Sequence, residues 1–549
     1  MAYICGTHRS QQTLFPECLE DYILKNNPVR AIDSFVECLD LESLGFQRAI
    51  PSQTGRPGYH PGDIIKLYLY GYLHRIRSSR GLEKETHRNV ELMWLIKRLN
   101  PDFKTIADFR KNNSDALKKT VRQFAFICKD MGLYGAQLIA IDGSKFQGVN
   151  NHKKVIKQKH LGEFLVLLDE MIQQYFDEVK KNDDSEGITV SELSKDLTQK
   201  LENMETKCKE IQKALETLDK VNAKKRKVTE SAPDSHHSTD KTMTKRKDKA
   251  LKNQQLKESD SVIDKDCQKQ KFSQYRETLK KAIHYMESND ETHIGLTDPE
   301  SKLMKNSGRK LFNMGYNIQI AVDSKHGLIV DHKVTNSGND QGMLAEMALS
   351  AKAILDVEST EVIADKGYYN YRDLKTCADN NIITYVKEQR HSNNASKNMF
   401  TKYDFTYDPD SDTYTCPANQ VLKPVKARSP NGKKKNYTTK ECISCLQRDL
   451  CTNNKRGRYI ERSPYEDFVE KNRERMEADP AKMNKRMHLA ESPFGILKKS
   501  MGYSEFLTKG LESVKAEISL SMLAMNFKKA LNVLGPEQII SFMGNMSPS

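Results

Sequence analysis

The feature of this sequence that most constrains its fold is a change of hydrophobic period near residue 138. Before it, apolar residues recur at helical spacing. The segment LIAIDGSKF, residues 138–146, instead opens with a short apolar run that leads into an aspartate and a glycine. Such a run is typical of a buried strand. Further extended runs lie at 314–323, 327–335, 361–364 and 382–387, with helical segments at about 341–355 and 371–378. This alternation predicts an α/β fold in which helices pack against a mixed sheet.

Helices are expected before that first strand. Apolar residues recur at helical spacing in RPGYHPGDIIKLYLYGYLHRIRSSRGLEK, and Asp102 can cap a second helix after a turn. The basic residues that we expect on the outside of these helices, as DNA contacts, are Arg77, Arg80, Lys104 and Arg110. Two helices joined by a short turn are compatible with a helix-turn-helix DNA-binding domain. An ordinary helical bundle with a solvated basic face explains the segment equally well.

A long helical insertion follows the first strand. Its apolar residues alternate by four and three, as a coiled-coil seam requires, at Leu197, Leu201, Met204, Cys208, Ile211, Leu215 and Leu218 and again at Phe272, Tyr275, Leu279, Ala282 and Met286. The two segments can pair as an antiparallel hairpin. The stretch from about 223 to 270 has few large apolar residues and predicts a flexible basic linker. The seam offers a surface for dimerisation, or the hairpin closes on itself.

The charge of the chain indicates the kind of partner. Its 549 residues include 88 Lys and Arg against 74 Asp and Glu, a net charge of +14, which favours a polyanion such as nucleic acid. An excess of lysine without such a partner would give the same balance. No apolar run is long enough to cross a bilayer, and the start lacks the apolar stretch of a signal peptide. We therefore expect a cytoplasmic protein without a membrane partner.

Two aspartates have matching settings. Asp142 and Asp365 each follow a short apolar strand and precede a glycine-containing turn. A strand end holds a carboxylate rigidly at the rim of a sheet, and carboxylate oxygens are ligands for hard divalent cations. A third acid on a helix beside that rim would complete a site for two Mg²⁺ ions about 3.5–4 Å apart, which can drive an in-line phosphoryl transfer. Singly, such an aspartate is more often a turn former, and Asp340 is interpreted as a helix N-cap.

Six blocks of the sequence resemble, in the proper order, those of bacterial insertion-sequence transposases with an acidic (DDE) triad, in the group numbered eleven-eighty-two. They are RPGYHPGDIIKLYLYGYLHRIRSSRGLEKE, AIDGSKF, LTDPESKLMKNSGRKLFNMGYNIQIAVD, VTNSGND, VIADKGYYN and HLAESPFGILKK. The resemblance covers nearly the whole chain. It implies an RNase H-like catalytic core, two Mg²⁺ or Mn²⁺ ions and double-stranded DNA as partner, namely the terminal inverted repeats of the element and its target. A homodimer is expected in the DNA complex, and a bacterial, nucleoid-associated location follows.

The resemblance also implies the catalytic residues. Asp142, Asp365 and Glu491 correspond to the metal-binding triad, and Lys498, seven residues after Glu491, to a phosphate contact. Related enzymes carry a tyrosine and an arginine before the third acid. Here Asn484 and Met487 occupy those positions, with Lys485 and Arg486 beside them. Because Pro493 cannot lie deep in a regular helix, Glu491 either precedes a helix or lies near a kink. The lower-ranked third acids are Glu505 and Glu517.

Four cysteines are grouped late in the chain. Cys416, Cys442, Cys445 and Cys451 have the spacing C-x25-C-x2-C-x5-C. Four thiolates suit a tetrahedral structural Zn²⁺, and the close Cys442/Cys445 pair is typical of one side of such a site. The spacing from Cys445 to Cys451 is looser than in a standard zinc ribbon, so four reduced, unpaired thiols are the alternative.

These observations divide the chain into six segments. They are an N-terminal helical, DNA-binding domain at 1–130, the first core strand at 131–150, the helical coiled-coil insertion at 151–300, the continued catalytic core at 301–390, the Cys-rich insertion at 391–465 and C-terminal catalytic helices at 466–549. Three functions remain open. They are a transposase that cuts and joins DNA, a metal-dependent nuclease that only cuts it, and a DNA-binding or scaffold protein with a vestigial nuclease fold.

Overall fold

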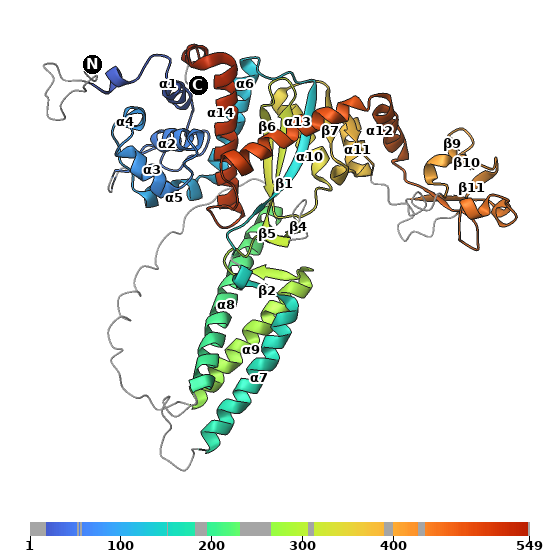
Figure 1. The fold of residues 1–549 in the computed structure, drawn as a ribbon, viewed down its shortest axis with the longest axis horizontal. Helices are drawn as coiled ribbons and strands as arrows, with labels where there is room; N and C mark the ends of the chain where they lie inside the picture. Colours follow the sequence, from blue (N-terminus) through green and yellow to red (C-terminus); the bar gives the residue numbers. More distant parts are fainter. Residues whose placement is uncertain are drawn as a thin grey trace, which may run out of the picture. The chain divides into compact units, whose positions relative to one another are not determined.

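The computed structural model describes residues 18–51, 54, 57–150, 152–181, 195–230, 265–305, 312–388, 399–425 and 434–546. The chain divides into two compact units (Figure 1). The first comprises Met1–Ser144, Asn317–Leu507 and Glu512–Ser549, and the second comprises Lys145–Tyr316 and Thr508–Leu511. Among the described residues, none of the helices combines the length and apolarity that a membrane crossing needs.

The main sheet contains the five predicted strands and one more. Its strands are β1 (Leu138–Gln147), β4 (Lys302–Lys305), β5 (Phe312–Asp323), β6 (Ile329–Thr335), β7 (Thr360–Ala364) and β8 (Ile382–Val386). Their order is β4-β5-β1-β7-β8, and β6 also pairs with β5. Strands β1, β7 and β8 are parallel, whereas β6 is antiparallel to β5. The predicted mixed sheet is confirmed. The additional strand, β4, has the sequence KLMK, which carries little apolar signal.

Four helices accompany this sheet: α10 (Met343–Leu355), α11 (Tyr371–Asp379), α12 (Glu466–Ala478) and α13 (Ala481–Gly495). Helix α10 packs on β6 and β7, α11 and α12 contact β8, and α13 lies against β7 (Figure 1). Ala490 of α13 is buried in one cluster with Leu138, Ala140 and Ile363. Side chains alternate between the faces of a strand, so α13 covers the face to which these residues of β1 and β7 point.

Helices of the N-terminal segment pack with the C-terminal helix. They are α1 (Pro28–Glu37), α2 (Pro61–Leu73), α3 (Ser79–Thr86), α4 (Val90–Leu95), α5 (Phe103–Asn112) and α6 (Ser114–Asp130), and the C-terminal helix is α14 (Leu511–Gly544). Asp102 caps α5 by accepting hydrogen bonds from the Lys104 and Thr105 amides, as predicted. The Phe527 ring of α14 packs on Phe35 and Phe124. Helix α14 therefore completes a core begun in α1, near the start of the described residues.

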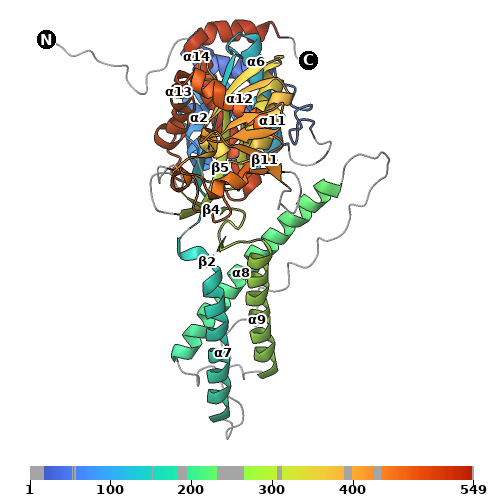
Figure 2. The same cartoon turned by 90° about the vertical axis from the view of Figure 1, so that its right-hand side faces the viewer.

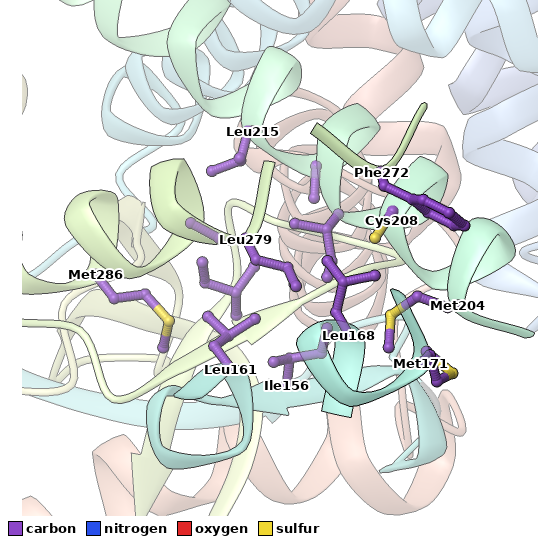
Figure 3. Packing of buried hydrophobic residues seen from close by; sticks show 14 of the residues in the cluster. Ile156, Leu161, Leu168, Met171, Met204, Cys208, Leu215, Phe272, Leu279 and Met286 are labelled. Carbon is purple, nitrogen blue, oxygen red and sulfur yellow. The ribbon is translucent and has the colours of Figure 1, made fainter. Parts of the chain in front are cut away.

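The second unit is built around three helices: α7 (Gln158–Lys181), α8 (Lys195–Glu230) and α9 (Lys265–Ser288). They lie side by side (Figures 1 and 2), next to the strand pair β2 (Val155–Lys157) and β3 (His293–Gly295). Predicted seam residues such as Met204, Cys208 and Leu279 pack inward against Leu168 and Met171 of α7 (Figure 3). The seam is therefore covered within the chain, by a third helix that the hairpin prediction did not include.

The predicted linker at 223–270 is wrong at both ends. Helix α8 continues to Glu230 and α9 begins at Lys265. Lys, Arg and Ala dominate the end of α8, and these residues favour a helix even without an apolar stripe. Residues 231–264, the rest of the predicted linker, lie outside the described residues.

The Cys-rich segment contains a small antiparallel sheet of its own. Its strands are β9 (Thr406–Asp408), β10 (Thr413–Thr415), β11 (Val421–Val425), β12 (Lys435–Thr438) and β13 (Ile460–Arg462), and each pairs with the next along the chain. Tyr414, Leu422 and Tyr437 form its core with Phe405 and Ile460. Among the described residues, the short helical turns are η1 (Leu19–Tyr22), η2 (His152–Lys154), η4 (Lys366–Tyr368), η6 (Lys402–Asp404), η7 (Lys440–Ile443), η8 (Arg448–Leu450) and the π-helical η9 (Ile496–Ser500).

Candidate active site

The two predicted aspartates follow paired positions on neighbouring strands. The parallel register of β1 and β7 matches Leu138 with Glu361 and ends with Ile141 opposite Ala364. The next residues of the two chains are Asp142 and Asp365. Adjacent strands lie about 4.8 Å apart, so the two carboxylates leave neighbouring points of one sheet. Both lie on the α13 side, because each is two residues beyond a member of the cluster that contains Ala490.

Asp142 is a largely buried carboxylate with a cationic partner. Its side chain is 16% exposed, and the Arg486 Nη1 donates to its Oδ2 at 3.2 Å. The Gly143 amide donates to the other oxygen at 2.9 Å. Burial, together with the negative charges of Asp365 and Asp340, raises the pKa of Asp142 to about 6, against the opposing effects of Arg486 and the Gly143 amide. Because burial disfavours the charged carboxylate, a bound cation would stabilise it.

Asp365 is held at the start of a tight turn. It is extended, with φ −71° and ψ 164°, and caps η4 by accepting a hydrogen bond from the Lys366 amide at 2.7 Å. From the sequence, Asp365 was expected at the end of its strand and Asp142 on its strand or just at the end of it. Asp365 directly follows β7, whereas β1 continues to Gln147 and leaves Asp142 in mid-strand. The carboxylate of Asp142 lies beside the end of β7 because that neighbouring strand is the shorter one.

Glu491 lies on the helix that covers these aspartates. It directly follows the buried Ala490, and its own side chain is exposed. Residues before and after Glu491 in the sequence contact β1: Arg486 donates to Asp142, and the Lys498 Nζ donates to the Ser144 hydroxyl at 2.6 Å. Within the described part of the chain, no hydrogen bond or ion pair joins the Glu491 carboxylate to either aspartate.

The helix that carries Glu491 is continuous through its proline. Helix α13 begins at Ala481 and includes Pro493, so Glu491 does not precede the helix. The five residues after Gly495 form the π-helical turn η9, which contains Lys498. Turns of this type occur frequently at functional sites. Burial lowers the pKa of Lys498, whereas the charge of Asp142 raises it.

Glu517, a lower-ranked third acid, belongs to the core and not to this site. Its side chain is fully buried, pairs with Arg77 at 3.2 Å and accepts a hydrogen bond from the Leu507 amide at 3.1 Å. Glu505, the other one, is exposed, and its backbone carbonyl accepts a hydrogen bond from Arg77. Neither carboxylate is linked to the two aspartates by a hydrogen bond or ion pair of the described residues.

The donor atoms of the aspartates suit a hard divalent cation. Even so, the described residues contain no group of three or more His, Cys, Asp or Glu side chains that could hold a metal ion. In the described conformation Asp142 and Asp365 each accept a hydrogen bond from the amide of the next residue, and Arg486 supplies the positive charge next to Asp142. Ion binding would have to compete with these contacts.

Asp340 is the residue of this region that the sequence analysis missed. It was interpreted as a helix N-cap, but the N-cap position of α10 is Gly342. The Asp340 Oδ1 instead accepts hydrogen bonds from the side-chain amides of Asn317 and Gln319, at 2.7 Å each. Both amides come from β5 and are fully buried. Two polar residues at alternate positions of the apolar run GYNIQIAVD were the available signal.

Two predicted DNA contacts are buried, so that prediction is wrong for them. Arg77 is 8% exposed and donates to the backbone carbonyls of Met501 and Glu505. Arg110 is 6% exposed, and its guanidinium bonds the Tyr72 hydroxyl and the Arg77 carbonyl. A guanidinium that is buried and bonded inside the protein cannot reach a phosphate. Both arginines instead hold α2, α3 and α5 to the C-terminal segment or to each other.

The other two predicted contacts in this segment are exposed. The Arg80 guanidinium of α3 lies 5.0 Å from the ring centre of Phe103, the first residue of α5. Phe103 is 41% exposed, and the exposed Lys104 follows it. Arg80 and Lys104 are thus available to solvent on two helices, α3 and α5, that contact each other.

The four clustered cysteines line one pocket, together with Phe405 and Arg458. All four thiols are free and partly buried. Burial raises the pKa of Cys451, as do the other three cysteines, whereas Arg458 lowers it. The fold therefore brings Cys416, Cys442, Cys445 and Cys451 together, although, as stated above, the described residues do not form a ready metal-binding group.

Comparison with known proteins gives two family matches. Residues 17–112 match a transposase domain family (DUF772), and residues 415–531 match a transposase DDE domain family. The first match spans α1–α5, and the second includes Glu491 and Lys498, whereas Asp142 and Asp365 lie outside both. No curated protein and no solved structure matches the chain. A mixed α/β fold is consistent with a DDE transposase, and this family uses divalent metal ions in general. Together, the two matched domains indicate a DNA transposase of the DDE type.

Proposed function

We propose that this protein binds the ends of its own insertion element and catalyses metal-dependent cleavage and strand transfer of DNA. It would act as a member of the insertion-sequence group numbered eleven-eighty-two. The observation that carries this proposal is the parallel register of β1 and β7, which continues into Asp142 and Asp365 under α13. Two aspartates at neighbouring positions of adjacent strands, together with Glu491 on the helix over them, would supply the carboxylates that a two-metal phosphoryl transfer needs.

Asp142, Asp365 and Glu491 would hold two Mg²⁺ or Mn²⁺ ions. When bound, the ions would activate the attacking hydroxyl and stabilise the leaving oxygen. The three parallel strands with antiparallel β5 and β6 on one side support an RNase H-like core. Asp142 supplies a buried carboxylate whose environment favours a cation. Lys498, bonded to Ser144 two residues beyond Asp142, would contact the phosphate next to the cleaved bond.

The remaining segments would bind and arrange the DNA. Arg80 and Lys104 are the candidate contacts of the 1–130 domain to the terminal inverted repeats. The helical segment 151–300 and the Cys-rich segment 391–465 would be insertions into the core formed by 131–150, 301–390 and 466–549. The four cysteines would bind a structural Zn²⁺, since four thiols around one pocket are its preferred donors. A homodimer would bring two element ends together, on the bacterial nucleoid.

The test is an assay of the full-length protein with labelled element ends, target DNA and Mg²⁺. Asp142→Asn and Asp365→Asn keep the shape of the side chain but remove its charge. We expect each to lower the cleavage rate by more than about a hundredfold and to leave DNA binding intact. Asp356→Asn is the matched control, because Asp356 is 82% exposed at the far end of α10.

The reaction products distinguish the transposase from the nuclease and from the DNA-binding scaffold. Nicked ends together with joined products support the transposase. Nicking without joining would make the protein a nuclease, and DNA binding without either would leave a scaffold. Cleavage at the wild-type rate by Asp142→Asn or Asp365→Asn would refute the assignment of the site.

A further inference from the structure

We propose that Asp340 is a positioning residue that fixes the segment of β1 carrying Asp142 and the turn carrying Asp365. The inference rests on the proposed function and concerns a residue outside the expected triad. Asp340 lies before α10, and its carboxylate is not used to cap that helix. Its backbone carbonyl accepts the hydrogen bond from Met343 instead, so the side chain is available for another role.

The carboxylate is held by two buried amides. The Asn317 Nδ2 and the Gln319 Nε2 donate to the same oxygen, Oδ1, at 2.7 Å each, and both residues are 0% exposed. Hydrogen bonds to a charged acceptor are about twice as strong as neutral ones. The other end of the Asn317 amide, Oδ1, is buried and has no hydrogen-bond partner in the described structure. A buried unpaired oxygen is costly, and it is retained here next to the proposed site.

A hydrogen-bonded chain leads from Asp340 to the Asp365 turn. The hydroxyl of Tyr368 donates to Oε1 of Gln319, the residue whose Nε2 bonds Asp340. Tyr368 is buried and ends η4, and its amide donates to the Asp365 carbonyl at 3.0 Å. Asp340 also faces this turn directly. Its second oxygen, Oδ2, lies 3.5 Å from the position that a Cβ would occupy if Gly367 carried a side chain. Gln319 therefore couples the Asp340 carboxylate to the turn that carries Asp365.

The side chains of Asp340, Gln319 and Tyr368 also lie close to the backbone of Gly143, the residue after Asp142. A Cβ added to Gly143 would lie 2.4 Å from the Gln319 Nε2, 2.9 Å from the Tyr368 hydroxyl and 3.0 Å from the Asp340 Oδ1. These distances leave room only for glycine at this position. Because the Gly143 amide is also a donor to Asp142, a shift of the network would move an amide that orients this carboxylate. One network thus supports both aspartates.

The experiment measures Mn²⁺ binding to the full-length protein by isothermal titration calorimetry, in the absence of DNA. Asp340→Asn keeps an acceptor oxygen for the two amides but removes the charge. Tyr368→Phe keeps the buried ring but removes the hydroxyl of the chain, and it serves as the second variant if Asp340→Asn does not fold. Outer-shell partners of metal ligands contribute about 10–100-fold in affinity, so we expect each variant to raise the Mn²⁺ dissociation constant by that factor.

Double substitution and matched controls make the result specific. Asp340 and Tyr368 act through one residue, so their effects should not be independent. The double variant should raise the Mn²⁺ dissociation constant by less than the product of the two single factors. Tyr369→Phe removes the neighbouring hydroxyl, which bonds Glu388, and Asp356→Asn removes a carboxylate at the other end of α10. Both controls should bind Mn²⁺ like the wild type.

Thermal unfolding of the metal-free variants distinguishes positioning from a structural role. If Asp340→Asn and Tyr368→Phe lower the melting temperature but leave the Mn²⁺ dissociation constant unchanged, the positioning role is overturned. If Asp142→Asn abolishes Mn²⁺ binding while these two variants bind normally, the proposed function stands and this inference fails. If wild type and Asp142→Asn bind Mn²⁺ equally, the metal site itself is wrong, and the inference falls with it.

Discussion

The buried pair of Arg77 and Glu517 allows a sharp test of the difference between a structural and a DNA-binding arginine. Arg77 was expected to contact DNA from the sequence, but in the structure it is 8% exposed and pairs with a glutamate that is 0% exposed. Its guanidinium also lies 3.5 Å from the ring centre of Tyr503. We expect Arg77→Ala to destabilise the fold and to have no direct effect on the DNA contact surface.

The magnitude follows from what the substitution leaves behind. Glu517 would keep a hydrogen bond from the Leu507 amide and the electrostatic attraction of Arg110, but it would lose the guanidinium with which it forms an ion pair. Removing one partner of a buried ion pair costs about 3–5 kcal/mol. The carbonyls of Met501 and Glu505 would lose a donor as well, and this loss is part of the same measured free energy. We therefore expect a loss of about 3–5 kcal/mol in the free energy of unfolding.

The assay is urea unfolding followed by circular dichroism and by the fluorescence of Trp94, the one tryptophan of the chain. Arg80→Ala is the matched control, since Arg80 is exposed in the same segment, and we expect it to change stability by no more than about 0.5 kcal/mol. DNA binding should show the reverse pattern, with Arg80→Ala weaker. If Arg77→Ala unfolds like Arg80→Ala and weakens DNA binding, the structural role of Arg77 is refuted.

Further expectations concern pH and metal removal. Burial lowers the pKa of His332 to about 4 from 6.5, so its contribution to stability is complete above pH 6.5 and is lost as the pH falls toward 4. Over that interval the free energy of unfolding of His332→Gln, measured with urea, should fall by up to about 3 kcal/mol less than that of the wild type. Identical pH profiles of the two proteins would contradict this. We also expect the purified protein to contain about one Zn²⁺ per chain. Cys442→Ser should lower the zinc content and the melting temperature, whereas Cys18→Ser, at an exposed single cysteine, should change neither; equal zinc in both variants would exclude the cysteine site.

Local patterns were sufficient to predict five strands of the main sheet and the two aspartates. The apolar runs at 138–146 and 361–364 correspond to β1 and β7 within one residue, because a buried strand needs apolar residues along its whole length. Asp142 and Asp365 follow from the same runs. The pairing of the two strands, which brings the acids together, depends on a contact across more than 200 residues, and no local pattern records it.

The errors have the same physical origin. Helical spacing shows that Arg77 and Arg110 lie beside apolar residues, but not that Glu517 of α14 will cover Arg77. For Asp340, the preference of aspartate for helix N-caps suggested a local role, whereas the amides that bind it come from β5. In both cases a polar side chain is satisfied by a partner distant in sequence, and sequence patterns of helix and strand do not identify such partners.

The contacts of α13 explain how Glu491 can lie near the proposed site without touching it. The helix is fixed to the sheet by the apolar contact of Ala490 and, on either side along the chain, by Arg486 on Asp142 and Lys498 on Ser144. Among the contacts of α13, an ion at Asp142 would compete only with Arg486, because the Ala490 contact and the Ser144 hydrogen bond do not involve the carboxylate. Loss of the Arg486 contact would thus leave α13 attached to the sheet, with Glu491 next to Ala490. The requirement for ion binding at Asp142 is then local: the ion must displace one guanidinium and compete with the hydrogen bond from the Gly143 amide.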